Sequence, residues 1–432
     1  MLRHAAFLAI LTGILLPSFA QIATPGQPLP AWKEGYLDLH HINTGWGDAA
    51  FYIFPDGTTL LFDAGEMNPT SNRAFTPRNA AMRPNYSKRA YEWIAEYIRK
   101  VSPLKDKAVI DYAAISHFHD DHFGSWYPGA KRSATGKYSL SGITGVGELI
   151  PIHYLLDRGY PDYNYPYDIK KHKDRFSGEI NFGKTMQNYF DFIAAQQQKG
   201  MKAAQLKAGS NSQIQMKYHP RQYPSFYVRN VKANGQIWTG KDSSVVSFFP
   251  AIDTGNPRSW PSENGLSLVL TLHYGPFTYY SGGDCGGIVS YGDEWWKDVE
   301  TPVAKAVGEV DIATLDHHGN RDAVNEFQVK TFKPRVWIQQ SWSSDHPGEE
   351  VLRRLTTPYL YEGPRDLFTT NMLDANKYVI GTLVDRSYKS LQGHIVVRIL
   401  PGGREYYVII LDDSREDMPV KDVFGPYTSK VK

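Results

Sequence analysis

The sequence has little that would cross-link it or draw it to a highly charged partner. One cysteine, Cys285, stands among 432 residues, so the chain cannot form an internal disulfide. Its 47 basic and 45 acidic residues leave a formal net charge of +2. That near balance gives no strong attraction to a nucleic-acid backbone or to an anionic membrane surface. The fold must therefore rest on its apolar core, for which a hydrophobic content of 41% is sufficient, and on any metal that it binds.

Long apolar runs and internal repeats are also missing, apart from one run at the N-terminus. This run, 5–16, follows the basic pair Arg3-His4 and is shorter than the roughly 20 residues that a membrane-spanning helix needs. Small residues then stand at Ser18 and Ala20, as before a signal-peptidase cut. We therefore expect a signal peptide over 1–20, no membrane span after its removal, and an exported protein, periplasmic or secreted. A retained anchor is the alternative; a lipoprotein would need a cysteine near the cut.

A dense group of polar residues follows the first hundred positions. Three histidines and two aspartates stand within 117–122. The segment before it, 111–116, is short, mostly apolar and bounded by charge, which predicts a buried strand. The group is thus expected in a loop at the end of a strand, where side chains are free to converge on a ligand.

The spacing within this loop favours a metal site. In an extended backbone His117 and His119 point the same way, because side chains alternate with a period of two. A turn at Asp120 lets Asp121 and His122 face the same space from another side. Imidazole and carboxylate together suit zinc, and also manganese or iron. The alternative interpretation is a polar surface loop with hydrogen-bonded histidines.

The rest of the chain alternates short apolar runs with turn signals. A linker rich in proline and glycine is expected at 21–35. Apolar runs around Pro55-Asp56-Gly57 predict a hairpin, and apolar residues on one face predict a helix over 88–100. Further elements are expected at 36–42 (strand), 49–54 and 58–63 (hairpin strands), 185–207 (helix), and 394–400 and 405–411 (closing hairpin).

Several motifs together carry a family resemblance. They are Gly45-Trp46-Gly47-Asp48-Ala49, Phe62-Asp63-Ala64-Gly65, Ser116-His117-Phe118-His119-Asp120-Asp121-His122, Ser281-Gly282-Gly283-Asp284, Asp316-His317-His318-Gly319 and His346-Pro347. This set closely resembles the metallo-β-lactamase superfamily, and within it the ComEC-type branch, over most of 36–400. The resemblance implies an α/β fold: an αβ/βα four-layer sandwich of two mixed β-sheets with outer helices. It also implies one domain over 36–412 and a C-terminal tail over 413–432.

A long segment at about 160–240 stands in place of a short connection in that family. We expect this segment to form a lid or rim over the metal edge. Its tyrosines could stack on a sugar or a base there, or face a quaternary ammonium. Packing of the insertion against the body of the protein is the favoured interpretation, since buried tyrosines usually serve that purpose. The tyrosines in and just before the segment are Tyr154, Tyr160, Tyr163, Tyr165 and Tyr167.

The resemblance also implies a set of metal ligands. His117 and His119 would hold a first ion. Asp121 and His122 would hold a second, together with one histidine of the His317-His318 pair. Asp284 would bridge the two. The expected cofactor is therefore a pair of divalent metal ions, zinc first, with manganese or iron as alternatives.

The sequence does not decide the identity of two of the ligands. We assign His317 as the ligand and His318 as the residue that touches substrate, although the reverse fits equally. The superfamily usually places a third histidine for the first ion near Glu263-Asn264, where this chain has none. The Asn264 carbonyl could substitute, whereas His153 and His273 do not stand at matching positions.

Two residues next to these ligands could either bind the metal or serve the structure around it. Cys285 could be a softer ligand, but a small buried residue in a glycine-rich loop is the favoured reading. Asp63 is expected to cap a turn and orient the ligands rather than bind metal.

Two ions without an obvious protein nucleophile imply hydrolysis by a metal-bridging hydroxide. Asp121 would orient it, and His318 or His346 would protonate the leaving group. The resemblance favours phosphodiester hydrolysis, of nuclease-like or phosphocholine-ester type, on a small-molecule or polymer ester. Nucleic acid is a substrate candidate but not a tight binding partner, because the chain has no basic stripe. The alternatives are an amide or ester hydrolase of β-lactamase or lactonase type, and a non-catalytic metal-binding module.

Overall fold

A computed structural model describes residues 22–171, 181–253, 255–256 and 259–430. The expected signal peptide, 1–20, lies outside these residues. Among them, every helix is too short or too polar to cross a membrane.

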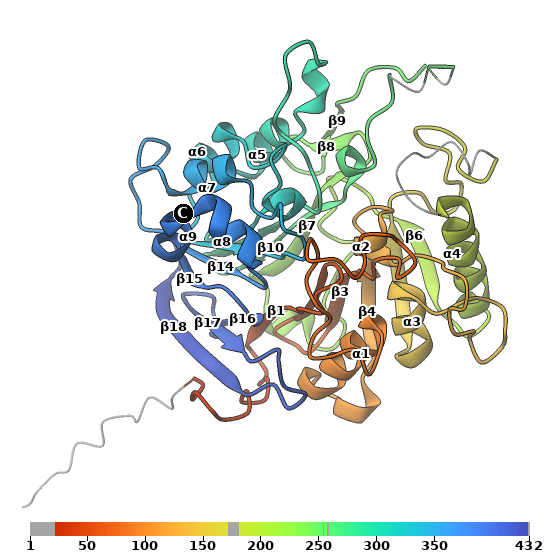
Figure 1. The fold of residues 1–432 in the computed structure, drawn as a ribbon, viewed down its shortest axis with the longest axis horizontal. Helices are drawn as coiled ribbons and strands as arrows, with labels where there is room; N and C mark the ends of the chain where they lie inside the picture. Colours follow the sequence, from red (N-terminus) through yellow and green to blue (C-terminus); the bar gives the residue numbers. More distant parts are fainter. Residues whose placement is uncertain (1–21, 172–180, 254, 257–258, 431–432) are drawn as a thin grey trace, which may run out of the picture.

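The first of two nine-stranded sheets contains both the first and the last strand of the described chain (Figure 1). Its order is β18 (Val420–Thr428), β17 (Glu405–Leu411), β16 (His394–Ile399), β1 (Leu37–His41), β2 (Ala49–Ile53), β3 (Thr59–Ala64), β4 (Ile110–Ala114), β5 (Ile152–Asp157) and β6 (Lys202–Gln205). Pairing is antiparallel from β18 to β3 and parallel from β3 to β6, so the sheet is mixed.

The second nine-stranded sheet is mixed in the same way. Its order is β15 (Tyr388–Ser390), β14 (Asp366–Thr369), β13 (Val336–Gln339), β12 (Ile312–Thr314), β11 (Phe277–Ser281), β10 (Val269–Tyr274), β7 (Phe226–Ala233), β8 (Gln236–Trp238) and β9 (Val245–Ser247). Pairing is parallel from β15 to β11 and antiparallel from β11 to β9.

The two sheets share one apolar core. Ala50 and Tyr52 of β2 join a cluster that also holds Leu270 of the second sheet, and the Tyr52 hydroxyl lies 3.0 Å from that of Tyr279. Phe51 of the same strand belongs to another cluster, on the opposite face. Since side chains alternate along a strand, β2 is buried on both faces.

Helices cover the outer faces. The cluster on the outer face of the first sheet contains side chains of α1 (Ala90–Val101), α3 (Gly142–Leu149) and α4 (Phe182–Gln197). The matching cluster of the second sheet contains side chains of α5 (Glu300–Val307), α6 (Glu326–Phe332) and α7 (Glu349–Thr356). The mixed α/β class and the two mixed sheets are therefore as expected, and the layering is compatible with a sandwich.

Most expected elements are confirmed within two residues. The helix expected over 88–100 is α1, whose apolar stripe includes Ile94 and Ile98. At its N-terminus the Arg89 backbone N–H donates to Glu92 Oε2 at 2.9 Å. The two hairpins are β2–β3 and β16–β17. The helix over 185–207 was predicted too long: α4 ends at Gln197, and Gly200, with φ of 103°, leads into β6.

The boundaries of the expected insertion and tail fall inside the sheets. The range 160–240 contains β6 of the first sheet and β7 and β8 of the second, and the range 413–432 contains β18. Tyr163 and Tyr167 are buried in the core cluster on the outer face of the first sheet, which supports packing as their role. The segment is therefore part of the frame and not a separable lid.

Candidate metal centre

The candidate ligands stand where strands of both sheets end. His117 and His119 follow β4, and the single turn of α2 (Asp120–Phe123) presents Asp121 and His122. From the second sheet, Asp284 follows β11, and the His317-His318 pair follows β12. Loops at strand ends tolerate the irregular backbone that such convergence needs.

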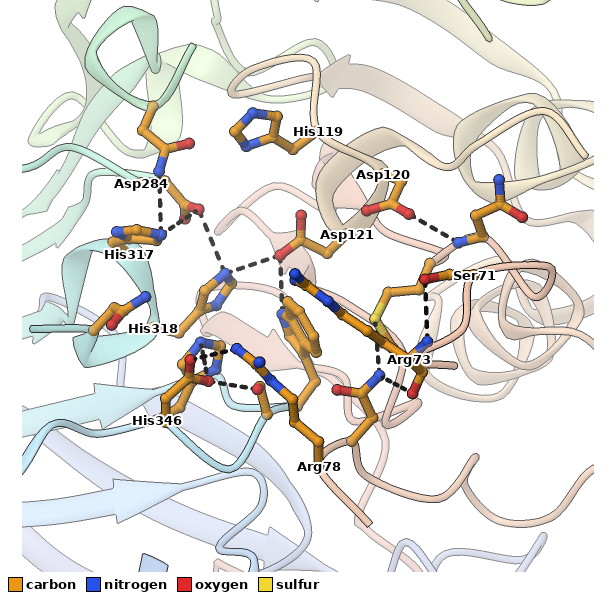
Figure 2. A pocket seen from close by; sticks show the side chains of 18 of the residues that line it. Ser71, Arg73, Arg78, His119, Asp120, Asp121, Asp284, His317, His318 and His346 are labelled. Carbon is orange, nitrogen blue, oxygen red and sulfur yellow. Dashed lines mark hydrogen bonds and ion pairs between the residues drawn. The ribbon is translucent and has the colours of Figure 1, made fainter. Parts of the chain in front are cut away.

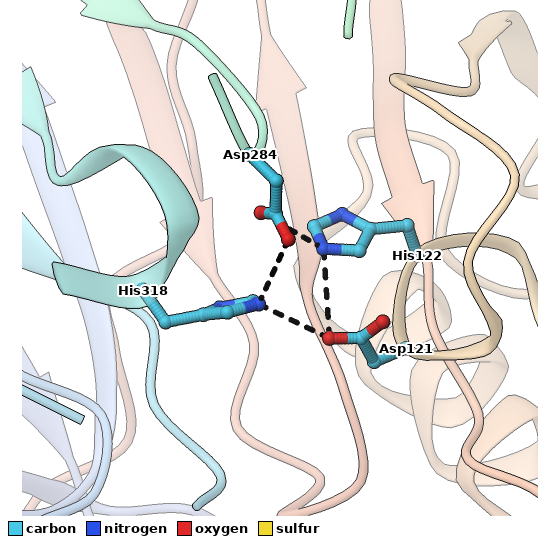
Figure 3. Close-up of side chains that lie close together, drawn as sticks. All are labelled: Asp121, His122, Asp284 and His318. Carbon is cyan, nitrogen blue, oxygen red and sulfur yellow. Dashed lines mark hydrogen bonds and ion pairs between the residues drawn. The ribbon is translucent and has the colours of Figure 1, made fainter. Parts of the chain in front are cut away.

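Four side chains form the first group (Figure 3), which we call the four-residue group: Asp121, His122, Asp284 and His318. One ligand atom from each lies within 4.8 Å of all the others. His122 Nε2 is 3.1 Å from Asp284 Oδ1, and His318 Nε2 is 3.1 Å from Asp121 Oδ2. All four side chains are buried, and two imidazoles with two carboxylates match the donor set that zinc prefers.

Three side chains form a second group, the three-residue group: His117, His119 and Asp284. His117 Nε2 lies 3.0 Å from His119 Nδ1 and 3.7 Å from Asp284 Oδ2. Asp284 is thus common to both groups. The expectation that one carboxylate serves two neighbouring sites agrees with this arrangement.

Two orphaned atoms test whether a cation fits. His122 Nε2 and Asp284 Oδ1 face each other at 3.1 Å as an ion pair, but both are buried and, among the described residues, neither forms a hydrogen bond. Buried polar atoms without partners are costly, and they are rare in native proteins. A divalent ion between them would satisfy both lone pairs, so the cluster could hold a metal ion.

A second set of contacts orients these ligands. Asp63 Oδ2 lies 2.9 Å from His122 Nδ1 and accepts a hydrogen bond from the Ser116 hydroxyl, which is itself 3.0 Å from His117 Nδ1. With Nδ1 of His122 engaged by a carboxylate, its Nε2 is left as the coordinating nitrogen. Asp63 therefore has the orienting role expected for it.

The geometry reverses the assignment within the histidine pair. His318 belongs to the four-residue group, and its Nδ1 lies 3.2 Å from Asp48 Oδ1. His317 Nε2 lies 3.8 Å from Asp284, while its Nδ1 contacts Asp322 at 2.6 Å. Both residues have positive φ, 46° and 55°, so their side chains diverge in a way that strand alternation does not predict. His318 is therefore the ligand candidate, and His317 lies beside the site.

Glu263 occupies the region where the third histidine was missing. Its buried carboxylate accepts hydrogen bonds from the Phe118 backbone N–H at 2.8 Å and from Arg158 Nε at 2.6 Å. The Arg158 guanidinium also lies 4.5 Å from the centre of the Phe118 ring. Glu263 is thus committed to an ion pair, and it holds the backbone between His117 and His119.

The other substitutes considered from the sequence lie outside both groups. His153 is 3.3 Å from Asp111, and His273 stacks on Tyr227. Burial raises the pKa of the Cys285 thiol, which opposes thiolate formation. Asn264 lies beside the site: its Nδ2 is 3.1 Å from His317 Nε2, and its Oδ1 is buried without a partner among the described residues.

The carboxylates dominate the electrostatics of the four-residue group. Burial opposes a charge on His122, but Asp284 and Asp121 outweigh it and raise the pKa of His122 well above its usual value. Burial likewise opposes a charge on His318, and Asp284 and Asp48 raise its pKa. Without a cation, protons therefore balance the carboxylates. A metal ion would displace these protons, so its binding should weaken as the pH falls.

Both groups border a cavity of about 410 Å³ (Figure 2). His346 lines it and stacks on His318, with ring centres 4.6 Å apart. Trp342 Nε1 donates to Asp121 Oδ2 at 2.9 Å. A further cavity of about 620 Å³ shares His119 and Asn264 with the first. A substrate in either cavity would reach the metal groups.

The sequence did not reveal which segment closes this cavity. No described residue of 160–240 lines either cavity; the wall opposite the ligands of the second sheet comes from the loop between β3 and α1. This loop contributes Met67, Asn68, Ser71, Asn72, Arg73, Arg78 and Asn79. It carries no motif or periodicity, and only the folded chain brings it over the site.

Comparison with known proteins gives no relative on which to base a function. Neither a protein-family model nor a curated protein matches this chain. The chemistry of the site must therefore be argued from its own residues.

Proposed function

We propose that this protein is an exported hydrolase that uses two divalent metal ions, zinc first, to cleave phosphodiesters. We further propose that its sandwich is the metallo-β-lactamase fold, of the ComEC-type branch. The observation that carries the proposal is the sharing of Asp284 between a four-residue and a three-residue group of candidate ligands beside one cavity; all are buried except His119, which is half-buried. A shared carboxylate screens the repulsion of two cations that lie about 3.5 to 4 Å apart.

His122, His318, Asp121 and Asp284 would hold one ion, and His117, His119 and Asp284 the other. When bound, such a pair supplies Lewis acidity and an activated water for attack at phosphorus.

The protein's own groups then divide the remaining tasks. Asp121 accepts hydrogen bonds on Oδ2 from Trp342, and His318 lies 3.1 Å from the same oxygen, so its carboxylate is fixed toward the cavity. His346 lines the cavity without belonging to either ligand group. Burial and the neighbouring His318 lower the pKa of His346, so its imidazole is neutral and would orient the substrate, while a bound water would protonate the leaving alkoxide.

Phosphodiesters fit this site better than neutral esters or amides. Two arginines and several asparagines line the cavity beside the ligands. Once two divalent ions neutralise Asp121 and Asp284, the wall is cationic and donor-rich, as an anionic ester requires. Within this proposal the ester is a small molecule or a polymer, and nucleic acid is a candidate substrate and not a tight partner.

The test joins metal analysis with a substrate panel. Purified protein should contain close to two equivalents of a divalent metal. After chelation and reloading with zinc, it should cleave bis(p-nitrophenyl) phosphate, and lose this activity on renewed chelation. The panel also holds p-nitrophenyl phosphate, p-nitrophenyl phosphorylcholine, single-stranded DNA and a chromogenic β-lactam. Metal-dependent cleavage of the β-lactam alone would reject the phosphodiesterase assignment.

A further inference from the structure

The loop between β3 and α1 brings an unpaired positive charge to the metal groups. Arg73 and Arg78 both reach from this loop into the cavity, toward the side that carries Asp284 and His317 (Figure 2). Arg78 Nη2 pairs with Asp345 Oδ2 at 2.9 Å. Within the part of the chain that the structure describes, no carboxylate or carbonyl oxygen pairs with the Arg73 guanidinium.

The loop is fixed to both halves of the site, so this charge has a defined place. The Asn68 backbone N–H donates to Asp120 Oδ2 at 2.8 Å, next to the ligands of the first sheet. On the other side, Ala80 N donates to Trp342 O at 2.7 Å. The Asn79 side chain ties the loop to itself, because its Nδ2 donates to Arg73 O at 2.7 Å. Arg73 is thus held at its backbone while its side chain stays free.

A second donor without an acceptor lies on the same wall. Asn68 Oδ1 accepts hydrogen bonds from the backbone N–H and the hydroxyl of Thr70, at 2.9 and 2.8 Å, which fixes the orientation of the amide. Its Nδ2 is therefore a donor, and it is buried without a partner among the described residues. Such a group is costly unless a ligand completes it.

The carboxylates of the cavity have other partners. Asp121 and Asp284 belong to the candidate ligand groups, and Asp120 receives the Asn68 N–H. Asp345 pairs with Arg78. Of the two arginines that line the cavity, Arg73 thus has no counter-ion among the described residues, and a planar guanidinium suits the oxygens of phosphate or carboxylate.

We propose that Arg73 and the Asn68 amide bind a second anionic group of the substrate, next to the ester that the metal groups hold. The preferred substrate is then a phosphodiester that carries a further phosphate or carboxylate, such as an oligonucleotide end with a terminal phosphate. This inference rests on the proposed function for its cleavable group. Binding of the second anion, in contrast, is measured as a dissociation constant and requires no turnover.

Three ligands with the same scaffold test whether the loop binds a second anion. They are thymidine 3′-phosphate, its analogue with a 5′-carboxylate, and its analogue with a 5′-phosphate. Titration calorimetry on zinc-loaded protein measures their dissociation constants. At least one of the two analogues with a second anionic group should bind about 10-fold or more tightly than thymidine 3′-phosphate, as one charge-assisted pair allows. Comparison of the carboxylate with the phosphate identifies the group that the wall prefers.

The Arg73→Gln variant should lose this difference, keep its metal content, and bind thymidine 3′-phosphate as before. Arg353→Gln is the matched control, because Arg353 is exposed on α7, pairs with Glu349 and does not line the cavity. Equal binding of all three ligands by the unmodified protein would overturn the proposal, as would a difference that survives in Arg73→Gln.

Turnover separates this proposal from the proposed function. A thymidine dinucleotide with a 5′-phosphate should be cleaved with a lower KM than one without, and Arg73→Gln should remove that gain. If neither dinucleotide nor any other diester is cleaved, but the second anion still binds through Arg73, the phosphodiesterase assignment fails and the anion site stands.

Discussion

Replacing Asp284 by asparagine should damage both metal groups at once. Asp284 contacts imidazoles of both: its Oδ1 lies 3.1 Å from His122 Nε2, and its Oδ2 lies 3.7 Å from His117 Nε2. Asparagine keeps the size of the side chain but removes the negative charge and one coordinating oxygen. The change therefore isolates the role of the shared carboxylate from its packing.

The expected loss of metal affinity can be estimated from substitutions that perturb a metal site less directly. Removing a residue that only orients a metal ligand typically costs about 10- to 100-fold in affinity. A coordinating carboxylate should cost more, so we expect a loss of about 100-fold or more for each ion. An ion present at about 100 times its Kd adds about 2.7 kcal/mol to the free energy of unfolding. For a chain of 432 residues, this corresponds to a shift of about 3 °C in Tm for each saturated ion.

Metal content after dialysis at a fixed free zinc concentration, together with Tm before and after chelation, measures both quantities. Unmodified protein should lose Tm on chelation, whereas Asp284→Asn should show little further change. Asp322→Asn is the control, because Asp322 contacts His317 and belongs to neither ligand group. Two retained equivalents with unchanged affinity in Asp284→Asn would refute the shared-carboxylate argument.

Three further predictions follow from individual residues. His318→Ala should release one equivalent of metal, whereas His317→Ala should keep two, as metal analysis will show; the reverse result would restore the assignment made from sequence. Burial lowers the pKa of His394 from 6.5 to about 3, so below pH 6.5 the unfolded chain gains a proton that the folded chain does not, and stability is lost as the pH falls. The free energy of unfolding, measured with urea at several pH values and equal metal content, should depend less steeply on pH in His394→Asn. The difference in slope should be about 1.4 kcal/mol per pH unit in this range. Intact mass of the mature protein should begin at Gln21, and retention of Met1 would contradict export.

The sequence predicted well the features that depend on local pattern. The run from His117 to His122 is a short motif at a strand end that predicts candidate ligands by itself, whereas Asp284 was assigned from the family resemblance. The strands of both hairpins were found for the same reason, since alternation and turn residues are local. Most of the candidate metal centre could therefore be predicted from the sequence.

What the sequence could not predict depends on tertiary structure. The choice between His317 and His318 turns on two consecutive residues in the left-handed region, where the alternation rule fails. The strands β6 and β7 were assigned to an insertion, because no local signal says that a short run will pair with an existing sheet edge. The loop that carries Arg73 has no apolar period. It is held over the cavity by its hydrogen bonds to both halves of the site and by the packing of Met67 and Ala74 in a cluster with Trp46, and these are long-range contacts.

Glu263 stands in the region where the family resemblance implies a third histidine, and its carboxylate is engaged elsewhere. A carboxylate in this region could in principle coordinate a metal, but both oxygens of Glu263 are engaged by Arg158, and one also accepts the Phe118 N–H. Removing one partner of such a buried pair leaves an uncompensated charge, typically at a cost of about 3–5 kcal/mol. Glu263 therefore stays with Arg158 and shapes the loop that presents His117 and His119.

The three-residue group accordingly offers fewer protein ligands than the four-residue group, and an ion there would have more positions open to water or substrate. The two ions of the proposed pair should then differ in function as well as in affinity: the four-residue group retains its ion, and the three-residue group provides the exchangeable positions at which a substrate oxygen enters.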